Sequence, residues 1–193
     1  MVTESDVKVF PINTYLRNTA LRIAIDRDEV ARKLGRVNEY SSYPGCESTV
    51  EMHWIGLLAE IPLEWFYTDL KKGQEWVINS VDTNKPDFIY KGQNIEVKCH
   101  TWHKWYETYF VEKRRWDKKK DVSKFLFCCM INDVPQRATV SKALGWIEAE
   151  RVDTYPVDDV KAWAADAYAI PIVDLKPMDD FFKEGVVNGK IPS

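Results

Sequence analysis

Two acidic residues and one lysine lie on either side of a short turn, at a spacing that brings their side chains together. Asp87 precedes the turn at Lys91-Gly92, and Glu96 and Lys98 follow it. A two-residue turn at this point, or a four-residue loop centred on it, pairs Asp87 with Glu96 across a hairpin. Side chains alternate between the faces of a strand, so Lys98 shares a face with Glu96. The same register pairs Tyr90 with Gln93, Ile89 with Asn94 and Phe88 with Ile95. The pattern predicts two carboxylates and an amine at one edge of a sheet, on its solvated face.

Two facing carboxylates repel each other, so one must take up a proton unless a cation lies between them. Mg²⁺ removes this conflict, because it favours hard oxygen ligands and keeps positions for water and phosphate oxygens. Lys98 could then orient a water molecule and offset the charge that develops on phosphorus. The alternative is structural: Asp87 is a turn residue, and Glu96 and Lys98 form the solvated face of an amphipathic strand.

The segment Pro86-Asp87, followed by Glu96-Val97-Lys98, resembles the signature of the PD-(D/E)XK nuclease superfamily. This superfamily includes restriction endonucleases, phage exonucleases and Holliday junction resolvases. The resemblance implies that Asp87 and Glu96 bind Mg²⁺, for which Mn²⁺ can substitute, and that Lys98 orients the attacking water. It covers roughly Val50 to Trp102 and implies a restriction-endonuclease-like core.

Members of the superfamily usually add a glutamate from a helix that precedes these strands. The segment Trp54-Ile-Gly-Leu-Leu-Ala-Glu60 is similar to that helix, which implies that Glu60 is a further metal ligand or supports the ligands. His53, Gly56 and Glu60 fall on one helical face, and the missing side chain at Gly56 should let the helix approach the sheet closely. Many members also carry a Gln or another polar residue on the helix after the lysine strand. No Gln occurs between Gln93 and Gln136, so the residue that completes the site stays open.

A basic and aromatic stretch follows the proposed site. Residues 104–120 contain seven basic and three acidic side chains, although the net charge of the whole chain is −3. A locally positive face can engage phosphates on an acidic body, because charges act over roughly 8–10 Å at physiological salt. The predicted DNA-binding residues are Lys104, Lys113, Arg114 and Lys118. The aromatic residues among them either stack on bases or form core, with Phe110 and Trp116 expected inside. His100 or His103 could touch a phosphate.

The apolar periodicity of the chain predicts alternating helices and strands. Helices are expected at 14–34 (whole, or broken near residues 26–28), 48–59, 109–120 and 157–167. Strands are expected at 76–81, 86–90, 94–99, 124–131 and within 138–150, with an extended piece and turn at 169–183. Pro62 should discourage continuation of the second helix. This order predicts an α/β fold with a mixed central sheet flanked by helices, in a single nuclease-like domain spanning 1–193.

Composition narrows the class of protein. Hydrophobic residues make up 45% and charged residues 30%, and no apolar run approaches the roughly 20 residues that span a bilayer. The polar start lacks a secretory signal, so the expected location is the cytoplasm. The cysteines form no Cys-x-x-Cys pair, and Cys99, Cys128 and Cys129 are expected to be reduced thiols in apolar surroundings.

These features predict a Mg²⁺-dependent deoxyribonuclease that hydrolyses phosphodiester bonds. The alternative is a catalytically inactive nuclease-fold protein that binds DNA or acts in assembly; a third is an interaction protein without nuclease ancestry. The absence of a visible specificity domain favours a small, weakly sequence-specific enzyme from a phage, a defence system or a repair system. Relatives with this fold often work as dimers or higher rings, so a homo-oligomer is compatible with the prediction. Whether the substrate is duplex, single-stranded or branched, and whether cutting starts at ends, stays open.

Overall fold

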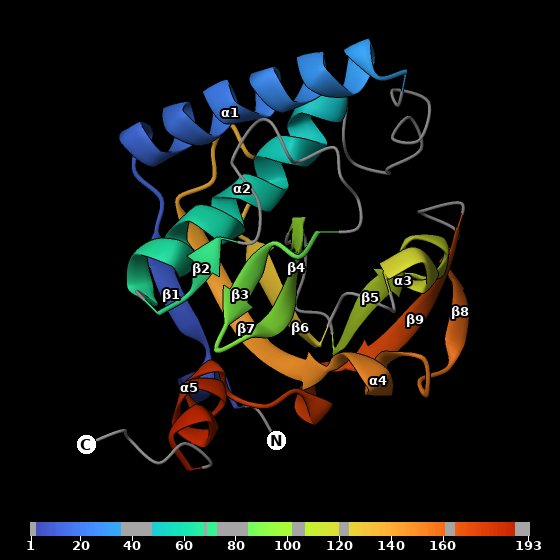
Figure 1. Cartoon of the computed structure of the whole chain (residues 1–193). Helices are drawn as coiled ribbons and strands as arrows, with labels where there is room; N and C mark the ends of the chain where they lie inside the picture. The colour runs from blue at the N-terminus through green and yellow to red at the C-terminus, as the bar shows by residue number, and fades with distance from the viewer. Residues whose placement is uncertain are drawn as a thin grey trace.

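The computed structural model describes residues 3–35, 48–67, 69–72, 85–101, 107–119, 124–160 and 165–187. These residues form a mixed α/β fold with two sheets and flanking helices (Figure 1). The larger sheet has the strand order β1 (Lys8–Pro11), β7 (Val140–Glu148), β6 (Phe125–Ile131), β4 (Gln93–Thr101), β3 (Phe88–Tyr90) and β2 (Lys71–Lys72). The smaller sheet has the order β5 (Thr108–Glu112), β9 (Ala165–Pro171) and β8 (Val157–Val160). Short 3-10 helices occupy Glu4–Asp6 (η1) and Ile172–Asp174 (η4). The expected α/β class with a mixed sheet is therefore confirmed.

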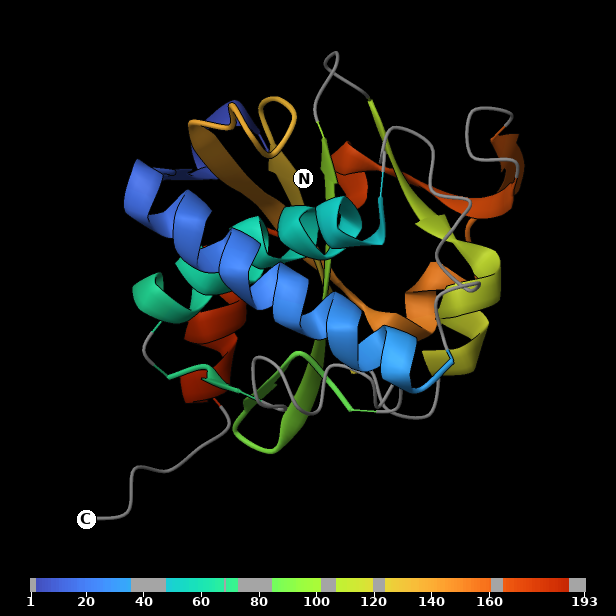
Figure 2. The ribbon, with the colours of Figure 1, turned by 90° about the horizontal axis from the view of Figure 1, so that it is seen from above.

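Helix α1 (Thr14–Lys33) lies across helix α2 (Thr49–Phe66), above the larger sheet (Figures 1 and 2). The side chain of Asn13 caps the start of α1 by accepting a hydrogen bond from the N–H of Leu16 at 2.8 Å. Gly35, with φ +70°, follows the end of the helix. The break considered near residues 26–28 is absent. Arg27 and Asp28 are buried there and paired with side chains of α2 and its first turn, so they stabilise the helix packing.

Helix α2 extends seven residues beyond the end at Ala59 that its sequence predicts, and contains Pro62 within it. A proline inside a helix removes a hydrogen bond and costs about 3 kcal/mol. Ile61 and Leu63 are almost fully buried on the same turn, and burying two such side chains offsets that cost by roughly 1.5–3 kcal/mol each. No described helix is long and apolar enough to cross a membrane.

The β3–β4 hairpin has the predicted register. Tyr90 pairs with Gln93, Ile89 with Asn94 and Phe88 with Ile95. Lys91 and Gly92 both have positive φ, at 47° and 78°, as a two-residue turn of this twist requires. Strand β4 then pairs in parallel with β6, which pairs antiparallel with β7. The strand predicted at 76–81 lies outside the described residues.

The helix predicted at 109–120 is wrong over its first four residues, which belong to strand β5. Tyr109 and Val111 are buried and their neighbours are only partly so, which is the period-two pattern of a strand. The helix itself, α3 (Lys113–Lys119), is short. It buries Trp116, as expected, whereas Phe110 is only half-buried.

The helix predicted at 157–167 is also wrong. Val157 to Val160 form β8, which pairs antiparallel with β9 from Ala165 onward. Residues 178–183, expected to be extended or turn, begin helix α5 (Met178–Val187). Phe181 packs edge-on against Phe127 and Trp146, in the same core cluster as Ala59 and Leu63 of α2, and this burial stabilises a helix there. A single turn, α4 (Ala149–Val152), follows β7.

Candidate active site

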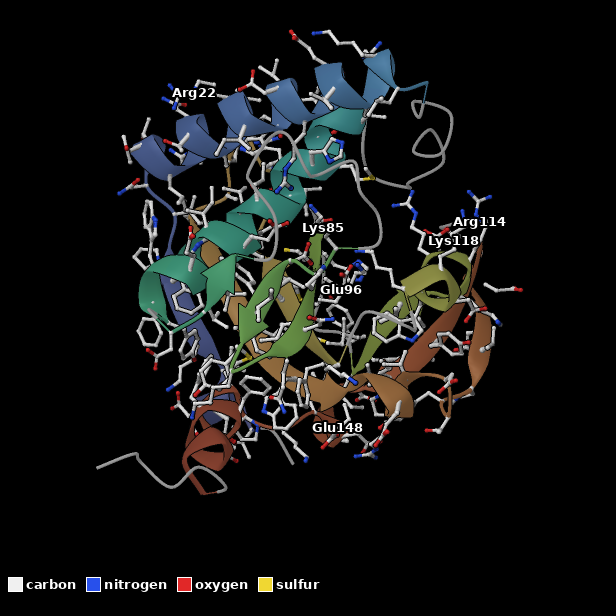
Figure 3. All side chains as sticks on the ribbon, viewed as in Figure 1. Arg22, Lys85, Glu96, Arg114, Lys118 and Glu148 are labelled. Carbon is white, nitrogen blue, oxygen red and sulfur yellow. The ribbon has the colours of Figure 1, made fainter. Side chains whose placement is uncertain are left out.

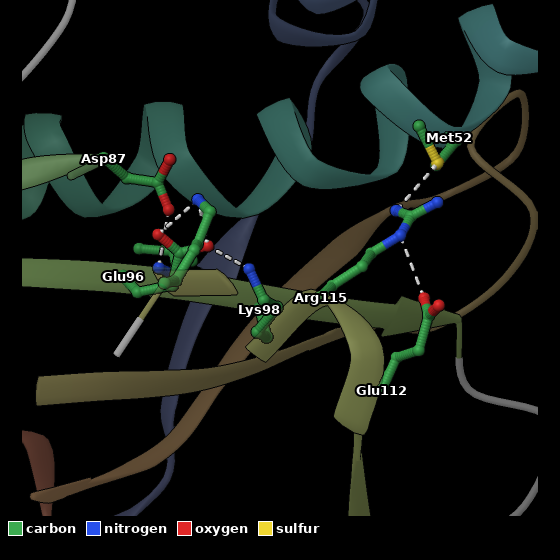
Figure 4. Close-up of polar contacts among 8 residues, drawn as sticks. Met52, Asp87, Glu96, Lys98, Glu112 and Arg115 are labelled. Carbon is green, nitrogen blue, oxygen red and sulfur yellow. Dashed lines mark hydrogen bonds and ion pairs between the residues drawn. The ribbon is translucent and has the colours of Figure 1, made fainter. Parts of the chain in front are cut away.

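The hairpin brings Asp87 against the backbone of β4. Its carboxylate accepts a hydrogen bond from the N–H of Val97 at 2.7 Å. Val97 lies between Glu96 and Lys98, so the Asp87 carboxylate is held beside both of these positions (Figure 4). The predicted cluster of two carboxylates and an amine therefore forms, on the hairpin that the sequence predicts.

The predicted solvent exposure of Glu96 is wrong, because its side chain is 1% exposed. In the parallel pairing of β4 with β6, Glu96 is level with Leu126 and Lys98 with Cys128. Leu126 and Cys128 pack under the smaller sheet and α3, so Glu96 and Lys98 point toward that covered face. The strand lies inside the larger sheet and not at its edge.

Two ammonium groups contact the Glu96 carboxylate. Lys98 forms an ion pair with its Oε1 atom. Lys119, from the last turn of α3, lies 2.6 Å from Oε1 and 2.7 Å from Oε2. The Lys119 side chain is only 18% exposed. Figure 3 shows Glu96 between the sheet and α3, in the centre of the molecule. Lys119 is a site residue that the sequence analysis did not single out, although it lies in the basic stretch.

The two acids differ in their electrostatic surroundings. Burial, with the charges of Glu96 and Glu60, raises the pKa of Asp87 to about 7. Burial would also raise the pKa of Glu96, but the ammonium groups of Lys98 and Lys119 hold it below its ordinary value. Near neutral pH, the Glu96 carboxylate is therefore ionised, whereas both the protonated and the ionised form of Asp87 are populated.

Glu60 is buried on α2, close enough to raise the pKa of Asp87. Its Oε2 atom accepts a hydrogen bond from the Arg27 guanidinium on α1 at 3.2 Å. The expected role of Gly56 is wrong: among the described residues, a Cβ atom there would meet only the Glu60 carboxylate, at 3.5 Å, and no atom of the sheet within 4 Å. That distance is an ordinary van der Waals contact, so close packing against the sheet does not require a glycine at this position.

The predicted DNA-binding residues separate into three groups. Arg114 and Lys118 are exposed and extend outward from α3 (Figure 3). Lys113 is half-exposed and forms an ion pair with Asp117 on the same helix. Lys104 lies outside the described residues. Arg115, next to Arg114, contacts Glu112 and the sulfur of Met52 on α2, to one side of the Asp87 and Glu96 carboxylates (Figure 4).

Cys128 and Cys129 are buried in the core, and Cys99 and His100 are half-buried beside it. The Nε2 atom of His100 lies 2.8 Å from the carbonyl oxygen of Phe110, which joins the two sheets, and burial lowers its pKa to about 4. Burial raises the thiol pKa of Cys99, Cys128 and Cys129, so they are unreactive thiols, as expected.

A scan against protein-family models, a search of curated proteins and a search of solved structures found no match to this chain.

Proposed function

We propose that this chain is a Mg²⁺-dependent DNA nuclease of the PD-(D/E)XK type, with Asp87 and Glu96 as metal ligands and Lys98 as the cation that orients the attacking water. The observation that carries the proposal is the convergence of Asp87, Glu96 and Lys98 on one hairpin. An ordinary amphipathic strand would place Glu96 in solvent. Here both acids are buried. The pKa of Asp87 is raised and that of Glu96 is lowered, and buried acids with shifted pKa values are typical of a functional site.

The donor chemistry fits Mg²⁺. This ion takes oxygen ligands, commonly one or two carboxylates with water and substrate phosphates, and Asp87 and Glu96 supply two. No group of three or more acidic, histidine or cysteine side chains is arranged to hold a metal among the described residues. Cations already contact these carboxylates: Glu60 pairs with Arg27, and Glu96 with two lysines. Glu60 as a third ligand therefore requires exchange of its partner.

The chemistry that a bound Mg²⁺ supplies is Lewis-acid activation of a phosphodiester and of water. The protein's part is to place the other charges. Lys98 is 24% exposed, so its ammonium group can reach a water molecule or a phosphate oxygen at the surface of the cluster. Charge that develops on the phosphate during attack is then stabilised by this amine.

Helix α3 connects this site to a surface suited to a DNA backbone. Its last turn sends Lys119 to Glu96, and Arg114 and Lys118 of the same helix extend into solvent (Figure 3). Phosphates that contact Arg114 and Lys118 would lie against the same helix that contacts Glu96 through Lys119. This arrangement favours DNA as substrate and needs no separate binding domain.

The test is a panel of labelled duplex, single-stranded and branched DNA, incubated with Mg²⁺, with Mn²⁺ and with EDTA. Cleavage that requires the metal and is lost in Glu96→Gln is the expected result. DNA binding without cleavage in every metal would instead support the inactive nuclease-fold protein. Size measurements with and without DNA decide whether the chain acts as a homo-oligomer.

A further inference from the structure

Lys119 occupies the place on Glu96 that a metal ion needs. Its ammonium group lies within 2.7 Å of both oxygen atoms of the Glu96 carboxylate. This ion pair places a positive charge on the carboxylate that the proposed function assigns to the metal.

With Asp87 ionised, the described cluster is balanced in charge. Its carboxylates are Glu60, Asp87 and Glu96, and its cations are Arg27, Lys98 and Lys119. A divalent ion added to this arrangement would leave two uncompensated positive charges in a poorly solvated region, which is unfavourable. Withdrawal of one internal cation as the metal enters would reduce this excess to one.

Lys119 is the cation best placed to leave. The backbone of Lys98 is part of β4, in the middle of the larger sheet, and Arg27 is buried between α1 and α2. Lys119 lies on α3 and reaches the carboxylate at the end of a long, flexible side chain. Withdrawal of that side chain moves no strand and breaks no helix hydrogen bond. It also adds a cation beside Lys118, on the side of the helix where we place the DNA.

We infer that Lys119 is a tethered competitor of the metal, which holds Glu96 in the metal-free protein and is displaced when Mg²⁺ or Mn²⁺ binds. The inference rests on the proposed function, because it takes Glu96 as a metal ligand. The measured association constant for the metal then equals the intrinsic constant multiplied by the fraction of molecules in which Lys119 has withdrawn.

The first experiment measures Mn²⁺ affinity of the metal-free full chain by electron paramagnetic resonance of the unbound ion. Lys119→Met should bind Mn²⁺ about tenfold more tightly than wild type, a change equivalent to roughly 1.4 kcal/mol. The control is Lys118→Met, which removes the same charge from the same turn without touching Glu96 and should stay within about twofold of wild type. A neutral hydrogen-bond donor in Lys119→Gln should give an intermediate affinity.

The second experiment uses the wild-type chain and so does not depend on the folding of any variant. Reductive methylation with mass spectrometry should modify Lys119 slowly in EDTA and several-fold faster with saturating Mn²⁺, while Lys118 reacts equally in both. Protection of Lys119 that is unchanged by bound Mn²⁺, or equal Mn²⁺ affinity in wild type and Lys119→Met, overturns the competition alone. Absence of Mn²⁺ binding in wild type and both Lys119 variants overturns the metal site, and with it the proposed function.

Discussion

The carboxylate of Asp87 accepts a hydrogen bond from the backbone N–H of Val97, at 2.7 Å. This bond ties the residue before β3 to the segment of β4 that carries Glu96 and Lys98. It gives Asp87 a structural task besides any role as a ligand. Asparagine keeps an oxygen acceptor for this N–H and loses the charge, whereas alanine loses both. The two replacements therefore separate the charge of Asp87 from its hydrogen bond.

Asp87→Asn is expected to stabilise the metal-free protein at neutral pH and to abolish cleavage. The pKa of Asp87 rises from its ordinary 3.8 to about 7 in the folded chain, so ionisation favours the unfolded state. The protonated carboxyl group of Asp87 contributes stability that is fully present below pH 3.8 and is lost as pH rises to about 7. The stability gained by Asp87→Asn should therefore grow across this window, as measured by urea unfolding at several pH values.

Asp87→Ala is the companion variant. It removes the same charge but also the acceptor for the Val97 N–H, so it should be less stable than Asp87→Asn by about 1–3 kcal/mol. Equal stability of the two variants would show that the hydrogen bond contributes nothing. A stability difference between wild type and Asp87→Asn that does not change with pH would contradict the raised pKa.

Replacement of Lys98 should separate catalysis from metal binding. Lys98→Ala and Lys98→Gln leave Glu96 with both of its contacts to Lys119, so the fold should persist. Turnover should fall by orders of magnitude while Mn²⁺ binding and DNA affinity are retained, because the amine acts on charge that develops during the reaction. Single-turnover rates at matched metal saturation test this. A rate near that of wild type would make this strand a structural one.

Local sequence signals account for the hairpin and the side chains that it brings together. A Lys-Gly turn and a period of two set the register over a few residues, so Asp87, Glu96 and Lys98 could be placed beside one another. Their burial could not be predicted, because it depends on α3 and the smaller sheet. The cationic partners are also distant: Arg27 is 33 residues from Glu60, and Lys119 is 23 residues from Glu96.

The two segments that were predicted as helix but form strands also depend on residues distant in the sequence. Thr108 to Glu112 and Val157 to Val160 are short and contain charged residues, so their periodicity is weak. Both become strands because they pair with opposite sides of β9, and the β5 pairing joins residues as far apart as Thr108 and Pro171. The sequence did contain a signal for Lys119. The predicted site held three acids and a single lysine, so its charge called for a further cation.

Removal of the outward charges of α3 should weaken DNA binding for all sequences alike. Arg114→Ala with Lys118→Ala should lower affinity and flatten its dependence on salt, since each phosphate contact contributes a slope of roughly −0.9 on duplex DNA. Addition of Lys113→Ala should have a smaller effect, because Lys113 already pairs with Asp117.

The matched control for this surface lies on α1. Arg22 and Lys33 are exposed on that helix, and Figure 3 shows Arg22 on the far side of the molecule from Arg114. Arg22→Ala with Lys33→Ala removes the same net charge and should leave the salt slope of DNA binding unchanged. Fluorescence anisotropy over a range of salt concentrations measures both slopes. Equal losses in the two double variants would move the DNA surface away from α3.

The Arg27–Glu60 ion pair gives the last prediction. Both side chains are buried between α1 and α2, 3.2 Å apart, and removing one member of such a pair leaves the other charge uncompensated. Arg27→Met should therefore destabilise the fold by about 3–5 kcal/mol, and Glu60→Gln in that background should restore much of the loss.

A double-mutant cycle of urea unfolding measures this coupling, and additive effects would mean that the two charges do not interact. The same variants test whether Glu60 is a metal ligand. In the Arg27→Met background, the released Glu60 carboxylate should raise Mn²⁺ affinity, and Glu60→Gln should reverse the gain. If both changes alter stability but leave Mn²⁺ affinity constant, Glu60 holds α2 to α1 and the metal is held by Asp87 and Glu96 without it.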